Sequence, residues 1–442
     1  MNQAPSYPSN GKPFKSIWAN NIALWSVGAM GFSINFGVAM VSVSSLLIVL
    51  AALFIFVSRQ HKSADLETDR THSKETTQRL SQRPKLTVYL IPIAILWMAV
   101  TGLWTESSLQ DSATQLMRYS RILVIPLIFF LIRTPEQSIK VLKVWIFGQL
   151  FVIASSYLLW IGIPIPWTST DSLYAMQYLT PYTSTLEQPI MNTIMFIVVW
   201  HLRDEFVAIW GKLTVNLILV ATVFEVFFIM EGRTGFLCMV LTLTLIFWRG
   251  VGSKLRILAV FLPLILLALV YTTSSRFERR VGEVVSDVQN YNQGKMTSQG
   301  NRIDFTKNSI IAIQEKPILG YGLGSWPLAY RHARGSVPTE FKDGVIKELK
   351  ADNPHQQFML WFVEGGVIAF GLLLGIYYSI YKDSNSLSKP AKHALQLVLA
   401  CIVFASFLNC PFHGAGMSEF LCFVIAVLLN LVNSDGKSLA ST

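Results

Sequence analysis

Charged residues are scarce in this chain of 442 residues. Asp, Glu, Lys and Arg make up 14% of it, whereas soluble proteins carry about a quarter. Hydrophobic residues reach 52%, and the mean hydropathy is +0.46. Apolar runs of about 16–20 residues recur from end to end and are long enough to cross a hydrocarbon core of about 30 Å. The composition excludes an ordinary soluble domain and predicts a polytopic membrane protein.

Several sequence signatures of common chemistries are also absent. The four cysteines form no Cys-x-x-Cys pair, so we expect them to pack as small apolar residues rather than to hold a metal or a disulfide framework. The chain has no Walker A motif, no serine-nucleophile elbow and no Asp-x-Asp pair. These absences argue against nucleotide-driven, serine-hydrolase and metal-bridged sugar-nucleotide chemistry. Activated substrates outside the cytoplasm are typically lipid-linked diphosphates instead.

The apolar runs predict an all-α membrane protein with about twelve spans. We place the spans at about 18–35, 38–57, 86–104, 119–133, 139–162, 189–202, 213–230, 234–248, 257–272, 356–380, 394–409 and 418–433. The N-terminal stretch before the first span is polar and Pro-rich, so we expect no cleavable signal peptide.

Loops on alternate sides of these spans differ in charge. The loops "WTSTDSLYAMQYLTPYTSTLEQP" and "CPFHGAGMSEF" contain neither Lys nor Arg, whereas the intervening short loops are rich in both. Basic loops favour the cytoplasmic side, so we expect both termini to be cytoplasmic. The formal net charge of +10 is largely explained by these loops, and we expect no nucleic-acid partner.

The segment from about 273 to 355 is too long to obey the charge rule and is expected to face outward. Its stretches "RFERRVGEVVSDVQNY" and "RIDFTKNSIIAIQEK" predict two amphipathic helices, and "KPILGYGLGSW" predicts a turn. We therefore divide the chain into spans 1–9 (1–272), a periplasmic loop domain (273–355) and spans 10–12 (356–442). The Gly-x-Gly-x-Gly pattern in the turn follows no strand, which argues against a nucleotide site.

Two arginines are candidates for binding an anion on the outer face. Arg233 lies in the turn "EGRTGFL" between two apolar runs. Arg302 opens an amphipathic helix after a Gly–Asn break, where backbone N–H groups and the helix dipole also favour anions. A guanidinium group binds phosphate oxygens through a fixed fork of donors. The alternative for Arg233 is a snorkelling side chain or a loop contact.

His355 is the candidate general base. Asn353 can cap the following helix and Pro354 suits its first position, which would place His355 in the first helical turn. The positive end of a helix disfavours an imidazolium, so we expect a neutral side chain that can accept a proton. The alternative is a histidine that only caps the helix.

Five further polar residues lie in or beside the spans. Arg118 and Arg121 flank the fourth span and could extend a basic pocket or anchor the helix at the interface. His413 faces outward without a defined role, Glu364 is expected to make a buried polar contact, and Glu225 is a similar intramembrane carboxylate.

Taken in order, these motifs resemble the O-antigen ligase and polymerase superfamily, and its ligase branch in particular. The resemblance covers roughly residues 190–385. It rests on Arg233, Gly235 and Leu237, on Arg302 followed by "EKPILGYGLGSW", and on His355 entering "FMLWFVEGGVIAFGLLL". Many relatives read His-Asn where this chain has His355-Gln356, although ligases accept Gln. Ala369 stands where Gly, Thr or Tyr is usual.

The resemblance implies a fold similar to the C-type glycosyltransferases, with a large helical insertion, and a metal-independent enzyme without a cofactor in the bacterial inner membrane. Its donor would be undecaprenyl-diphosphate-linked O-antigen and its acceptor lipid A-core. Arg233 and Arg302 would hold the diphosphate, with Arg118 and Arg121 beside them. His355 would deprotonate the acceptor hydroxyl at the periplasmic face.

Two other functions remain open at this stage. A polymerase, or a ligase for another surface glycan, would share the arginines and differ in acceptor. A transporter of lipid-linked glycans would favour inverted repeats with broken spans. The chain shows no convincing repeat, and its polar residues gather outside the spans.

Overall fold

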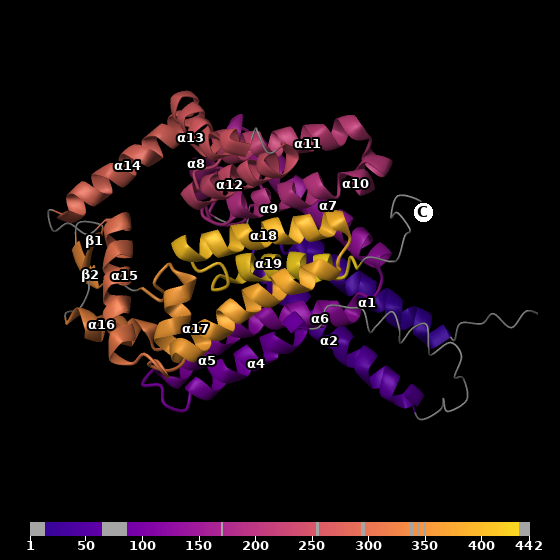
Figure 1. The fold of residues 1–442 in the computed structure, drawn as a ribbon, viewed down its shortest axis with the longest axis horizontal. Coiled ribbons are helices and arrows are strands. Elements are labelled where there is room, and N and C mark those ends of the chain that lie inside the picture. The colour runs from indigo at the N-terminus through magenta and orange to yellow at the C-terminus, as the bar shows by residue number, and fades with distance from the viewer. Residues whose placement is uncertain are drawn as a thin grey trace, which may run out of the picture.

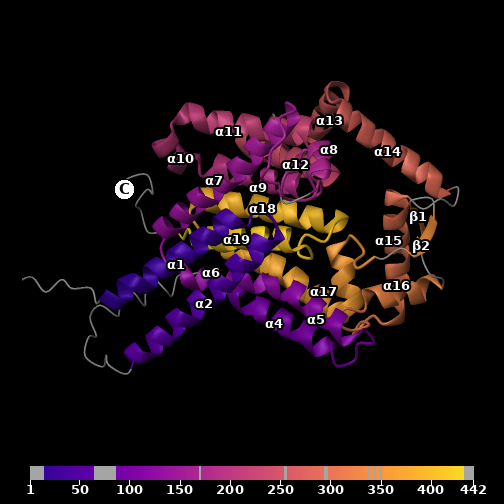
Figure 2. The same cartoon turned by 180° about the vertical axis from the view of Figure 1, so that it is seen from behind.

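The computed structural model describes residues 14–63, 86–168, 171–252, 256–292, 297–335, 339–342, 345–348 and 351–432. Within these residues the chain is almost entirely helical, with one two-stranded hairpin. Long helices run side by side through the middle of the molecule, and α14, α15, α16 and the hairpin gather at one end (Figures 1 and 2). The helices α1 and α2 reach the opposite end.

The first half of the chain forms helices that match the first eight predicted spans. They are α1 (Phe14–Ser33), α2 (Val38–Ser63), α4 (Leu86–Thr101), α5 (Leu109–Ser120), η1 (Arg121–Leu123), α6 (Val124–Leu131), α7 (Pro135–Trp160), α8 (Ser172–Tyr178), α9 (Gln188–His201), α10 (Arg203–Trp210), α11 (Lys212–Phe224), η2 (Glu225–Ile229) and α12 (Arg233–Gly250).

The second half contains the insertion and the last spans. Its elements are α13 (Arg256–Thr273), α14 (Ser275–Asn292), α15 (Ser298–Glu315), α16 (Trp326–Arg334), β1 (Thr339–Lys342), β2 (Val345–Glu348), α17 (Gln357–Asp383), η4 (Ser384–Ser386), α18 (Lys389–Leu408) and α19 (Ala415–Leu429). Both predicted amphipathic helices of the insertion are present, as α14 and α15. The antiparallel hairpin is an addition to the predicted all-α fold.

Five helical stretches are long and apolar enough to cross a membrane: Leu109–Leu131, Pro135–Trp160, Lys212–Ile229, Gln357–Ser386 and Lys389–Leu408. A sixth candidate is the bent pair α13 and α14, whose axes meet at 105°. These stretches make the protein a multi-pass membrane protein. The helices Ser42–Val57, Leu86–Thr101 and Ala415–Leu429 are apolar but shorter, so the full count of twelve spans stays a prediction.

Helix α19 lies at the centre of the bundle. Every residue from Gly416 to Leu429 is buried. From Phe420 onward the helix is apolar around its whole circumference and has no polar stripe to present to water. It packs mainly against α6, η1 and α18. The surrounding helices instead expose apolar side chains outward, as expected where lipid replaces water.

The span that ends before the Arg233 turn closes in a π-helix rather than an α-helix. In η2 the N–H of Met230 donates to the carbonyl of Glu225 at 2.9 Å, five residues back. The Glu225 carboxylate is buried and accepts a 3.2 Å hydrogen bond from Gln188 Nε2 on α9. π-helical turns are rare and often lie beside functional sites.

Helix α17 breaks at Gly366, and the glycine-rich turn of the insertion fills the break. The N–H groups of Tyr321 and Gly322 donate to the carbonyls of Val363 and Glu364 at 2.8 and 2.9 Å. The N–H of Val367 donates back to the carbonyl of Pro317 at 2.9 Å. The turn "KPILGYGLGSW" therefore joins the insertion to the membrane bundle.

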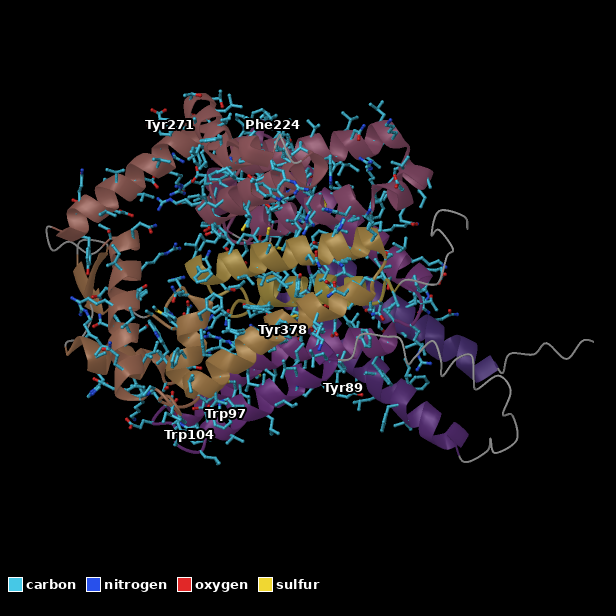
Figure 3. The ribbon with its side chains drawn as sticks, viewed as in Figure 1. Tyr89, Trp97, Trp104, Phe224, Tyr271 and Tyr378 are labelled. Carbon is cyan, nitrogen blue, oxygen red and sulfur yellow. The ribbon has the colours of Figure 1, made fainter. Side chains whose placement is uncertain are left out.

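The same break orients two neighbouring groups. Glu364 is buried and accepts a 2.6 Å hydrogen bond from the Tyr119 hydroxyl, which confirms the predicted buried contact. The carbonyl of Gly365, freed by the break, accepts from Trp97 Nε1 at 3.1 Å. Trp97 and its neighbour Trp104 lie near the end of α4 closest to the insertion (Figure 3). Ala369 is fully buried beside Gly365, so a larger side chain would find little room there.

Candidate functional site

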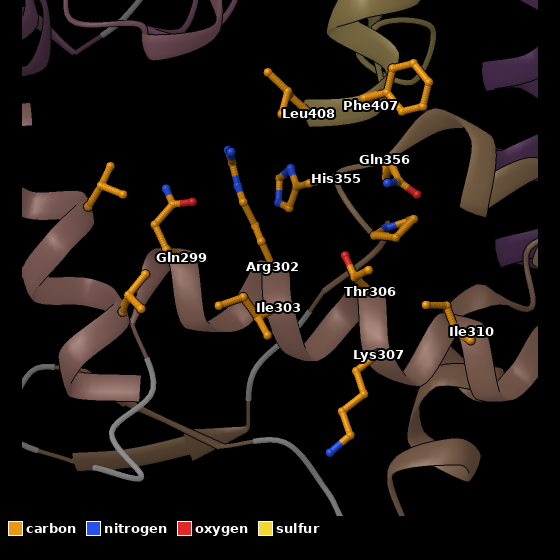
Figure 4. Close-up of a pocket in the computed structure, with 13 residues that line it drawn as sticks. Gln299, Arg302, Ile303, Thr306, Lys307, Ile310, His355, Gln356, Phe407 and Leu408 are labelled. Atoms are coloured by element: carbon orange, nitrogen blue, oxygen red, sulfur yellow. The ribbon is translucent and has the colours of Figure 1, made fainter. Parts of the chain in front are cut away.

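A cavity of about 520 Å³ lies where the insertion meets the membrane bundle (Figure 4). One wall is apolar and comes mainly from α14, α15 and the end of α18. The other carries polar and cationic side chains from α15 and from the turn before α17. The lining residues are Val284, Val288, Gln299, Arg302, Ile303, Thr306, Lys307, Ile310, Pro354, His355, Gln356, Phe407 and Leu408. Such a lining suits a ligand with both an apolar and an anionic part.

Arg302 lies on the cavity wall with its guanidinium group beside the His355 ring (Figure 4). Within the described residues no carboxylate lies within ion-pair distance of it. Burial lowers the pKa of Arg302 from its ordinary value, and the nearby positive charge of Arg233 lowers it further. Helix α15 begins at Ser298, so Arg302 lies in the second turn rather than at the predicted helix start. Its positive charge, not the helix terminus, is what it offers an anion.

Arg233 is the first residue of α12, in the turn predicted between two apolar runs. Its Nη2 contacts Glu283 Oε2 on α14 at 3.1 Å. A Cβ atom on Gly232 would collide with the Thr185 carbonyl, and one on Gly235 would collide with Pro189 at the start of α9. The two glycines therefore let α12 begin directly against α9, which fixes the position of the arginine between them.

His355 lies before α17 rather than in its first turn, which corrects the sequence prediction. The helix begins at Gln357, and His355 has a left-handed backbone with φ of 52°. Asn353 does not cap the helix. Its Oδ1 accepts from the N–H of His355 at 2.9 Å, which closes a local side-chain turn instead. The imidazole stacks on the Phe305 ring at 6.2 Å between centroids and lines the cavity.

The surroundings of His355 favour its neutral form. Burial lowers the pKa of His355 from its ordinary value of 6.5, and the positive charge of Arg302 lowers it further, against the opposing charge of Asp352. The direction of the shift agrees with the expected neutral ring, but its causes are burial and a neighbouring cation rather than a helix dipole. A neutral imidazole at an accessible cavity can accept a proton from a hydroxyl group.

Arg118 and Arg121 contact a different set of partners from the cavity residues. Arg118 Nη1 lies 3.0 Å from Asp352 Oδ2 and 2.6 Å from His413 Nε2. Arg121 donates to the carbonyl of His413 at 2.9 Å. Burial lowers the pKa of His413 to about 4, so its ring is neutral. The predicted diphosphate-binding role of these arginines stays a prediction, and Arg118 contacts the turn that carries His355 through Asp352.

A carboxylate–arginine network around Arg233 was not foreseen from the sequence. Glu231, two residues before Arg233, contacts three arginines of α14, and Glu283 contacts Arg233. The three arginines are Arg276, Arg279 and Arg280. Their spacing places them on one helical face, and this cluster of positive charge is the feature of the network that the sequence indicates. The sequence does not indicate that Glu231 contacts this face, because that contact depends on the tertiary structure.

Residues 218–374 match a protein-family model described as O-antigen ligase. The matched segment contains Arg233, Arg302 and His355. A segment of 141 residues is also 28% identical to an uncharacterized protein of Haemophilus influenzae, covering 31% of this chain and 33% of that relative. The chain thus matches about a third of the length of this relative. Residues 218–374, which carry all three candidate site residues, are thus similar to the family of O-antigen ligases.

Proposed function

We propose that the protein is an O-antigen ligase, a glycosyltransferase that moves O-antigen from undecaprenyl diphosphate to lipid A-core. The observation that carries the proposal is the pairing of Arg302 and His355 in one cavity. An arginine without a carboxylate partner among the described residues lies beside a neutral histidine. A cation and a base are the two groups that transfer from a lipid-linked diphosphate requires.

The mixed lining of the cavity fits such a donor. Apolar side chains such as Val288 and Phe407 suit the lipid chain, and Arg302 suits the diphosphate. Arg233 lies close enough to Arg302 to lower its pKa, so the two guanidinium groups can share one anion. Both the alternative polymerase and the ligase would use this part of the site.

In the proposed reaction, His355 removes the proton from an acceptor hydroxyl as its oxygen attacks the anomeric carbon of the donor sugar. The bond from that carbon to the diphosphate oxygen breaks, and the electron pair leaves with undecaprenyl diphosphate. Attack opposite the leaving group inverts the anomeric configuration. Arg233 and Arg302 stabilise the charge that grows on the diphosphate, which a divalent cation does in other glycosyltransferases. We therefore propose a metal-independent mechanism.

The membrane arrangement is part of the proposal. We place the chain in the bacterial inner membrane with 273–355 in the periplasm, both termini in the cytoplasm and a C-type glycosyltransferase-like architecture. The gathering of the insertion elements at one end of the bundle supports this arrangement (Figure 1). Cysteines introduced at exposed positions of α14 should react with an impermeant thiol reagent in intact spheroplasts. Labelling only after lysis would overturn the topology and the mechanism with it.

Reconstitution with two acceptors tests the function. Purified full-length protein in nanodiscs would receive undecaprenyl-diphosphate-linked glycan, with either lipid A-core or a second lipid-linked repeat as acceptor. We expect transfer to lipid A-core. Chain growth on the second lipid-linked repeat would assign the protein as a polymerase instead, and transfer to neither acceptor would overturn both assignments.

A further inference from the structure

The two carboxylates near Arg233 differ in how firmly they are held. Glu231 has a side chain only 3% exposed, and all its contacts are to α14 arginines: Arg276 and Arg279 on Oε1, and Arg280 on Oε2. Glu283 is 39% exposed; its Oε2 contacts both Arg233 and Arg280, and its Oε1 lies 3.9 Å from Arg279 Nε. Glu231 is thus a buried anchor for α14, whereas Glu283 is an accessible carboxylate.

Arg233 and Arg280 share that one oxygen of Glu283. Arg233 Nη2 lies 3.1 Å from Oε2, and Arg280 Nη1 lies 2.7 Å from it. Two guanidinium groups therefore converge on one anionic position. The Nε atom of Arg280 is buried and has no hydrogen-bond partner among the described residues, so this side chain has an unused donor there.

The surroundings carry more positive than negative charge. Arg233, Arg302 and the three arginines of α14 face only Glu231 and Glu283 within the described residues. The network therefore keeps three uncompensated positive charges. Uncompensated charge of this kind attracts an anion more strongly than a neutral network would.

We propose that Glu283 is a resting counter-ion that holds the place of the donor diphosphate, and that Arg280 is a third arginine of the diphosphate site. When a diphosphate binds, the contacts of Glu283 with Arg233 and Arg280 break, and both arginines bind the diphosphate. The separate contact between Arg280 and Glu231 remains. This inference deepens the proposed function, because it names the residues that exchange partners at the same site.

The exchange is favourable on simple electrostatic grounds. A diphosphate brings two negative charges and several acceptor oxygens, whereas Glu283 brings one charge and offers both arginines the same oxygen. Charge-assisted, bidentate contacts between arginine and phosphate are stronger and better oriented than a shared single-oxygen contact. The exposed position of Glu283 lets its carboxylate turn to water when it is released.

The test is the affinity of the full-length protein in nanodiscs for inorganic diphosphate. Glu283→Gln removes the competing charge, so we expect the dissociation constant to fall by about fivefold, with a smaller gain at high salt. Glu278→Gln is the matched control. Glu278 lies on the same helix, is exposed, and makes no ion pair among the described residues, so we expect an unchanged constant. Equal gains in both variants would reduce the effect to net charge and overturn the proposal.

Arg280 is tested against Arg276, since each contacts Glu231 but only Arg280 also contacts Glu283. We expect Arg280→Gln to weaken diphosphate binding by about tenfold and to cancel the gain of Glu283→Gln in the double variant. Arg276→Gln should leave binding near the wild-type value. Equal losses in both arginine variants, or weaker binding in folded Glu283→Gln, would show that the network only supports the fold.

Binding of inorganic diphosphate uses no glycan, so this inference and the proposed function can fail separately. If the affinities change as expected but no acceptor receives glycan, the proposed transfer reaction is wrong and the diphosphate site stands. If glycan transfer occurs but Glu283→Gln leaves diphosphate affinity unchanged, the counter-ion role is wrong and the proposed function stands.

Discussion

Two groups of cationic and imidazole side chains meet the turn 351–356, and they differ in how their charges are compensated. In the cavity pair, Arg302 and His355, the arginine has no carboxylate within ion-pair distance in the described part of the chain. In the paired cluster, Arg118 and His413 are joined to Asp352, and Arg121 binds a backbone carbonyl. Judged by residue type alone, both groups consist of arginine and histidine. Among the described residues Arg302 therefore has no carboxylate contact that a ligand would have to displace, whereas Arg118 has one.

The comparison shows why a count of arginines is a poor guide to an anion site. A guanidinium group that already holds a carboxylate must give up that contact before it can bind phosphate. The cavity pair requires no such exchange. The paired cluster instead stabilises the turn, and Asp352 lies only three residues before His355.

Removing a member of the cavity pair should have the largest effect. We expect His355→Ala and Arg302→Ala each to lower glycan transfer by about 10²–10⁴-fold, because a base or a leaving-group cation is lost. The measurement is initial rate in reconstituted nanodiscs. His332→Ala is the matched control, since His332 is 70% exposed and lies outside the cavity. Full activity in His355→Ala would remove the base assignment.

Gly366→Ala should weaken both groups together. A Cβ atom there would collide with the Ile318 carbonyl, and the residue has a φ of 66°. Loss of the glycine turn from the α17 break should lower the free energy of unfolding by about 2–4 kcal/mol, measured by thermal unfolding in detergent. Gly371→Ala, in the same helix with open space around it, should change little. Equal stability of the two variants would contradict this account of the break.

Arg118→Ala separates positioning from binding. The Arg118–Asp352 pair is partly exposed, so we expect its loss to cost about 1 kcal/mol of stability. A less ordered His355 turn should lower kcat by about tenfold with little change in KM for the donor. Arg118→Lys should restore part of the rate. A large rise in donor KM would instead support the diphosphate-binding role predicted from the sequence.

The pH profile is expected to show the smallest effect, and it tests the proton-accepting role of His355 most specifically. The pKa of His355 lies below 6.5, and only the neutral ring accepts a proton. The value of kcat/KM should therefore rise with pH through this lowered pKa and reach its plateau at a lower pH than an ordinary histidine would give. Asp352→Asn removes a negative charge that favours the imidazolium, so the acidic limb should move to still lower pH. A shift to higher pH would contradict the electrostatic role of Asp352.

Much of the helix placement followed from sequence because hydrophobic runs are a local property. The predicted spans fall on helices, and α14 and α15 lie where their amphipathic patterns indicated. The hairpin β1–β2 was missed although Asp343-Gly344 separates its strands, a dipeptide typical of short hairpins. Each strand has only four residues, too few for an alternating pattern to stand out beside the helical patterns around it.

The errors around His355 have a physical origin. Asn353 and Pro354 suit a helix start, but they equally suit a local turn, and the sequence does not decide between them. The neutral state of His355 was expected for a different reason from the observed one. The pairing of Glu231 and Glu283 with arginines required the packing of α12 against α14, which no local pattern encodes.

The π-helix before Arg233 adds one residue to the span without changing the face on which the following residues lie. A π-helical turn accommodates one residue more than an α-helical turn. Deleting one apolar residue from η2 would therefore let the helix continue with regular α-helical hydrogen bonds, while Glu231 and Arg233 keep their positions. Deleting a residue from the α-helical part of α11 would instead rotate everything that follows by about 100° and turn Glu231 away from the arginines of α14. A change of one residue in length should therefore be tolerated within Val226–Ile229 but not in the α-helical turns before it.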